Sequence, residues 1–104
     1  MKKYAALRLY YAPDKYQGQS VVTLNEQGEV LSFFSLDEET HTTEWVGGII
    51  ILSSKATISI EENYNDLLTE EHYTANTPIY AWHLFPFDFK NECPTPNSIL
   101  KKLN

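Results

Sequence analysis

The order of apolar and polar residues predicts a mainly β chain that begins with a strand. Over residues 4–11 the odd-numbered positions carry Ala, Leu, Leu and Tyr and alternate with a set that includes Arg8. This two-residue period is typical of a half-buried strand. Ala12-Pro13-Asp14 ends the strand, and residues 16–20, with one glycine and two glutamines, indicate a loop.

A hairpin and a buried strand are predicted next. Two β-rich runs, residues 21–24 and 29–36, are joined by four residues that end in Gly28, which can adopt a positive φ. Residues 42–52 are extended and almost wholly apolar after Trp45. A strand that is apolar on both faces lies inside a sheet. We therefore expect this segment to be central, Trp45 to be at least partly buried, and a following glycine to allow a close approach.

The second half predicts two helices around one more strand. Ser59 and Glu62 have the spacing of a capping box, and the apolar residues that follow fall on one face, so a main helix is expected over residues 60–71. Thr95-Pro96 can open a short C-terminal helix that ends near Leu103.

The last strand is expected over residues 79–84 and can continue to residue 89. Its far part should be an edge, because Pro86 has no N–H for a ladder. The expected fold is thus one mainly β (α+β) domain over residues 1–104, an antiparallel sheet or small β-sandwich with one main helix and a short C-terminal helix.

Composition excludes several classes of partner. The chain has 104 residues, a formal net charge of −6 and a pI near 4.9, so its field repels nucleic acids and anionic membranes. The longest apolar run, residues 46–52, is far shorter than the roughly 20 residues of a membrane span. Arg8 interrupts the apolar stretch that a signal peptide would need, and the single cysteine, Cys93, fits a reducing compartment. A cytoplasmic location is expected.

Candidate chemistry is sparse. The three histidines His41, His72 and His83 share no metal-ligand spacing, and we interpret His83 as a hydrogen-bonded core residue. Cys93 is followed by a proline and has no histidine nearby, and the paired glutamates are typical of a solvated face. The sequence therefore predicts no enzyme, no cofactor and no metal site.

Aromatic residues form the one candidate surface. Phe85, Phe87 and Phe89 line one side of the final strand if it stays regular, and Trp82 lies beside them. Such a stripe can floor a ligand pocket or contact a partner, although core packing explains most aromatic residues in a chain this short.

Two segments resemble the small β-sandwich that precedes the barrel in metal-dependent amidohydrolases. They are residues 21–31, with the glycine turn, and residues 43–52, the apolar strand. In that family the strand runs on into a His-x-His metal pair, where this chain has Leu52-Ser53-Ser54. The resemblance implies a stand-alone relative of the accessory β domain, without the barrel of about 250 residues and without its catalytic residues.

Three functional hypotheses follow from these observations. The first is a non-enzymatic β-rich domain that binds another protein or itself through an edge strand. The alternative is a small-molecule binding module with an aromatic-lined pocket, and the third is a small enzyme with a dispersed site of His83 and carboxylates.

Overall fold

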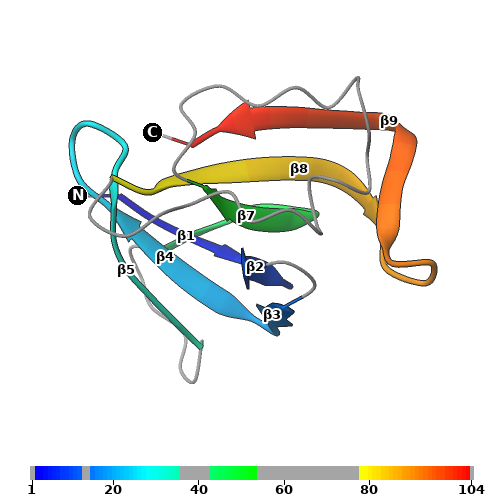
Figure 1. Cartoon of the computed structure of the whole chain (residues 1–104), viewed down its shortest axis with the longest axis horizontal. Helices are drawn as coiled ribbons and strands as arrows, with labels where there is room; N and C mark the ends of the chain where they lie inside the picture. The colour runs from blue at the N-terminus through cyan, green and yellow to red at the C-terminus, as the bar shows by residue number, and fades with distance from the viewer. Residues whose placement is uncertain (1, 13–14, 36–42, 54–77, 104) are drawn as a thin grey trace.

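The described part of the chain consists of two mixed β-sheets. The computed structural model describes residues 2–12, 15–35, 43–53 and 78–103. The four-stranded sheet has the order β5-β4-β1-β6 and the five-stranded sheet the order β3-β2-β7-β8-β9 (Figure 1). In chain order the strands are β1 (Lys2–Ala6), β2 (Leu9–Ala12), β3 (Lys15–Gln17), β4 (Ser20–Leu24), β5 (Val30–Ser35), β6 (Thr43–Trp45), β7 (Ile49–Ser53), β8 (Tyr80–Asp88) and β9 (Cys93–Lys102). A mainly β chain is confirmed, but both sheets are mixed, so the expected antiparallel sheet is wrong.

Parallel pairing arises because two segments pass from one sheet to the other side by side. β1 lies parallel to β6 in the first sheet, and β2 lies parallel to β7 in the second. Where the segments cross, the Val46 amide donates to the Ala5 carbonyl at 2.8 Å and the Ile50 amide donates to the Arg8 carbonyl at 3.0 Å. Backbone pairing therefore continues through the bend.

The crossing corrects two sequence predictions. Residues 4–11 are not one strand but β1 and β2 in different sheets, and residues 42–52 likewise divide into β6 and β7. At the bend the core-facing positions change from even-numbered Tyr4 and Ala6 to odd-numbered Leu9, so the two-residue period of the sequence does not show where the strand changes sheets. Leu7, at the bend, is 49% exposed.

One hydrophobic core joins the two sheets. It combines residues of β1 and β4 with residues of β2, β7 and β8, and Leu103 closes it after the last strand. Its buried members are Tyr4, Ala6, Leu9, Val22, Leu24, Ile50, Leu52, Ala81 and Leu103. Burial of apolar surface on this scale is the main stabilising contribution to a fold of this size.

A second cluster covers the other face of the five-stranded sheet. Its members come from the alternate positions of the same strands: Tyr10, Ile49, Ile51, Trp82, Leu84 and Phe87. All five residues of β7 are buried, and β7 is the third strand of five. The predicted central place is confirmed for β7, because a strand covered on both faces needs so continuous an apolar sequence, but β6 is the terminal strand of the other sheet.

The predicted hairpin is confirmed as β4 and β5. Gly28 has a φ of 82°. The Asn25 side-chain oxygen accepts hydrogen bonds from the amides of Gln27 and Glu29, both at 2.9 Å. A local side-chain contact thus shapes the turn, which explains why this feature could be recognised from sequence.

Two other local predictions are wrong. The expected loop at residues 16–20 contains most of β3 and the start of β4, and the expected C-terminal helix is the strand β9. A helix this short is marginal alone, whereas β9 pairs with β8 from Asp88↔Cys93 to Trp82↔Lys102. The expected main helix over residues 60–71 lies outside the described residues.

The prediction for the end of the last strand is confirmed. Among the described strands, β8 pairs with β7 as far as Leu84 and beyond it with β9 alone, so no described strand lies on the other side of β8 at Pro86. Pro86 also coincides with a shift in register between Phe85 and Phe87. In the part of the chain that the structure describes, no helix has the length and apolar character to cross a membrane.

Gly48 allows the closest approach between β8 and the crossing segment. Its φ is +71°, and a Cβ built on it would lie 2.0 Å from the Leu84 carbonyl oxygen. At Gly47 a Cβ would meet the Phe85 ring at 2.5 Å. The predicted close approach is confirmed. Trp45, in the terminal strand β6, is 48% exposed and is a member of neither core cluster.

Gly48→Ala should therefore lower the free energy of unfolding by about 3 kcal/mol, through left-handed strain and a backbone clash. Gly18→Ala is the matched control, because nothing lies within 4 Å of the Cβ position at Gly18. That control should stay within about 0.5 kcal/mol of the parent. Urea unfolding of both variants measures the difference, and equal midpoints would contradict the close approach at Gly48.

Candidate functional site

The four aromatic residues predicted as a surface do not form one stripe. Trp82 and Phe87 are buried at 7% exposure each, Phe85 is 50% exposed, and Phe89 packs partly buried against the second cluster. The register shift between Phe85 and Phe87 moves the later residues to the opposite face of β8. Phe85 instead stacks on His83, with 6.0 Å between ring centroids.

Phe87 and Phe89 belong to a different group, the aromatic–arginine cluster, which consists of Arg8, Tyr10, Tyr16, Phe87, Phe89 and Glu92. Tyr10 and Tyr16 are opposite residues of β2 and β3, with ring centroids 5.1 Å apart. The Phe87 ring lies 6.5 Å from Tyr10 and 5.1 Å from Phe89, both edge-on. The cluster thus joins the β2–β3 hairpin to the end of the β8–β9 hairpin.

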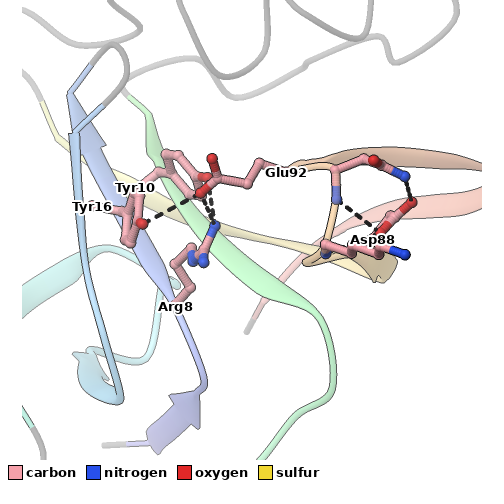
Figure 2. A network of polar contacts seen from close by, with 7 residues as sticks. Arg8, Tyr10, Tyr16, Asp88 and Glu92 are labelled. Atoms are coloured by element: carbon pink, nitrogen blue, oxygen red, sulfur yellow. Dashed lines mark hydrogen bonds and ion pairs between the residues drawn. The ribbon is translucent and has the colours of Figure 1, made fainter.

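Arg8 lies at the centre of this cluster. Its guanidinium carbon is 4.0 Å from the centroid of the Tyr16 ring and 5.3 Å from that of Phe89, which is the geometry of cation–π contacts. Nη1 donates to the Tyr10 hydroxyl at 3.4 Å and to Glu92 Oε1 at 3.1 Å (Figure 2). The Tyr16 hydroxyl donates to the same Glu92 oxygen at 3.4 Å.

The turn between β8 and β9 presents Glu92 to Arg8. Asp88 Oδ1 accepts from the amides of Lys90 at 3.0 Å and Asn91 at 3.1 Å, and Oδ2 accepts from Asn91 Nδ2 at 2.7 Å (Figure 2). Glu92, two residues before Pro94, has a φ of 54°, a left-handed conformation that costs a non-glycine residue about 1 kcal/mol.

The electrostatics of the cluster keep the Arg8 guanidinium charged. Burial lowers the pKa of Arg8, but the hydrogen bond to Tyr10 and the charges of Tyr10, Tyr16 and Glu92 together raise that pKa above its ordinary value. Burial raises the pKa of Tyr10. The guanidinium is therefore permanently charged and the Tyr10 hydroxyl stays protonated, so the cluster offers hydrogen-bond donors around one cation.

The other candidate residues take no part in this cluster. His83 contacts the Gly47 carbonyl oxygen through Nε2, which fits the predicted hydrogen-bonded histidine, and it is half-buried rather than fully enclosed. Cys93 is half-buried in β9 opposite Asp88. His41 and His72 lie outside the described residues. Within residues 2–12, 15–35, 43–53 and 78–103, no three side chains of His, Cys, Asp or Glu gather as metal ligands would.

A second candidate surface is the β5 edge, defined by the exposed side chains of Leu31, Phe33 and Phe34. They are 53%, 39% and 43% exposed, and β5 is the terminal strand of its sheet. The Phe33 ring stacks on Tyr11 of the other sheet, with 6.1 Å between centroids. The strand carries three large apolar side chains and no charged residue.

The sequence missed the residues that matter most here. Arg8, Tyr16 and Glu92 meet from positions 84 and 76 residues apart, and no local pattern marks such a meeting. Comparisons with protein-family models, curated proteins and solved structures find no match for this chain.

The Asp88 turn generates a prediction about pH. Hydrogen bonds from the Asn91 side chain, and then from its amide, lower the pKa of Asp88. Because the folded pKa lies below the unfolded one, this stabilisation is complete above the unfolded pKa and is lost as the pH falls through the folded pKa. A ¹³C NMR titration of the Asp88 carboxyl should give a lower midpoint in the folded chain than in urea, and Asn91→Ala should raise that midpoint. Equal midpoints in the folded and unfolded chain would contradict the turn geometry.

Proposed function

We propose that this chain is a non-enzymatic β domain that acts by pairing with a second copy of itself along the β5 edge. The observation that supports the proposal is the contrast between β5 and the other terminal strands of the described sheets. β3 and β6 have three residues each, and β9 carries two prolines and two lysines. Short length, proline and lysine are the features by which proteins block strand addition at an edge.

β5 has none of these protections. It spans six residues of sequence VLSFFS, without charge, proline or glycine, and pairs on one side with β4. Among the described residues, the amide of Val30, the first residue of β5, donates to the Ile79 carbonyl beside the Glu29↔Tyr80 bridge, and no named strand other than β4 pairs with residues 31–35. A strand of this composition is a template for backbone hydrogen bonds from another strand.

A second copy of this chain is a better partner for the β5 edge than a different protein that carries the same net charge. Two copies of β5 in antiparallel register present the same patch to each other, as a two-fold dimer requires. Each chain carries a net charge of −6, which opposes association, but the uncharged β5 brings no like charges face to face. The exposed apolar side chains of the two copies would then cover each other.

We propose in addition a kinship with the accessory β domain of metal-dependent amidohydrolases. The two segments of resemblance coincide with the β4–β5 hairpin and with β6–β7. Under this proposal the chain keeps the β scaffold and uses an edge strand for association.

Light scattering at micromolar concentration should report a mass of about twice 12.0 kDa. Leu31→Lys and Phe34→Lys each place like charges on β5 in both copies, so each should weaken the dimer by about tenfold or more. Hydrogen exchange should show that the β5 amides lose protection in both variants.

Ile99→Lys is the matched control, since Ile99 is a 70% exposed apolar residue on the protected edge β9. It should leave the mass unchanged. A parent chain that is monomeric at all concentrations, or a dimer that Ile99→Lys disrupts and the β5 variants do not, would refute pairing through β5.

A further inference from the structure

The Arg8 side chain and backbone are held in place by their neighbours, which favours the binding of a planar anion. It is the one arginine of the chain, its side chain is 16% exposed, and its guanidinium lies against the Tyr16 and Phe89 rings. Its backbone is also held, because its carbonyl accepts the Ile50 amide at the sheet crossing. A guanidinium restrained in this way loses little conformational entropy on binding a carboxylate.

Glu92 satisfies only part of the hydrogen-bonding capacity of the Arg8 guanidinium. One carboxylate oxygen, Oε1, takes the contacts from both Arg8 Nη1 and the Tyr16 hydroxyl, so the pair is not the two-point fork that arginine and carboxylate form at their strongest. Arg8 Nε and Nη2 make no hydrogen bond to a described residue. The Glu92 side chain is 56% exposed and reaches Arg8 from the surface. Its left-handed backbone conformation is energetically unfavourable for a residue other than glycine.

We propose that Arg8, Tyr10 and Tyr16 form a binding site for the carboxylate of a small organic acid, and that Glu92 occupies this site as an internal, displaceable carboxylate. On binding, the ligand takes the Arg8 fork and the Tyr16 hydroxyl, and Glu92 moves out into solvent. The rings of Tyr16 and Phe89 beside the cation favour an acid whose carboxylate is attached to an aromatic or other flat apolar group. This site is independent of the β5 edge.

Displacement makes an unusual prediction, because removing a charged residue beside the site should strengthen binding. The apparent affinity of a site is reduced by the fraction of time that it is blocked, and an exposed ion pair of this kind corresponds to about a fivefold effect. Benzoate is the probe, and benzamide, which has the same shape without the charge, is its control. Binding is measured by titration while the Arg8 Nε–H signal is followed by NMR.

The expected result is that the parent chain binds benzoate weakly and that Glu92→Gln binds it about fivefold more tightly. Glu92→Gly is a second variant that also removes the carboxylate and accepts the left-handed φ, so it keeps the turn even if the amide variant does not fold. In both variants the Arg8 Nε–H signal should shift when benzoate is added and stay unchanged with benzamide.

Two further variants test the recognition itself. Arg8→Lys keeps the charge but loses the fork and the planar contact, and Tyr16→Phe keeps the ring but loses the hydroxyl, so each should weaken benzoate binding. Lys102→Ala is the matched control, because Lys102 Nζ also lies over a ring, 4.8 Å from the centroid of Tyr80, at a different place. It should leave the affinity unchanged.

The proposal is overturned if Glu92→Gly, folded as judged by its thermal unfolding, binds benzoate no more tightly than the parent chain. Equal binding of benzamide, or an Arg8→Lys variant that binds as the parent does, would overturn it as well. In each of these cases the Arg8–Glu92 pair is a structural tie between two hairpins and not an occupied ligand site.

Discussion

The parallel course of residues 2–12 and 43–53 is the constraint on which the rest of this structure depends. Both segments leave the four-stranded sheet and enter the five-stranded sheet at the same level, and backbone hydrogen bonds from Val46 to Ala5 and from Ile50 to Arg8 keep them paired across the bend. A polar backbone that passes between two apolar layers must keep its hydrogen bonds, because an unpaired amide there would be strongly destabilising. Paired crossing satisfies this requirement.

The crossing also positions both candidate surfaces. Arg8 lies at the bend. Its side chain therefore lies outside the inter-sheet core and contacts the aromatic residues on the other face of the five-stranded sheet. At the opposite end of the first sheet, β4 contributes buried valines while its partner β5 extends beyond the core and keeps both faces exposed. One surface is thus a polar group enclosed by rings, and the other is an open apolar edge.

These two surfaces imply different kinds of binding. The proposed backbone pairing at β5 would be tolerant of side-chain identity, so its affinity would come from strand length and apolar contact. The proposed site at Arg8 would instead select by charge and planarity, because its donors are few and directed. A chain with both features can associate through β5 and bind a small acid at the Arg8 cluster, because the two sites share no residue.

Local chemistry allowed several features to be predicted from the sequence alone. The Asn25–Gly28 turn predicts its hairpin because a side chain and a glycine act within four residues, and the unbroken apolar run predicts the central strand β7 because both faces require cover. The close approach at Gly48 follows for the same reason.

Only the tertiary structure decided which sheet each strand joins, that the C-terminal segment is β9, and where the aromatic residues point. The core-facing positions change from Tyr4 and Ala6 to Leu9 across the bend at Leu7. A register shift at Pro86 places Phe85 and Phe87 on opposite faces. Arg8 and Glu92 are 84 residues apart in sequence, and they meet because the two hairpins lie together in space. Pattern and propensity report on neighbours along the chain, whereas pairing between distant strands is selected by the packing of the whole core.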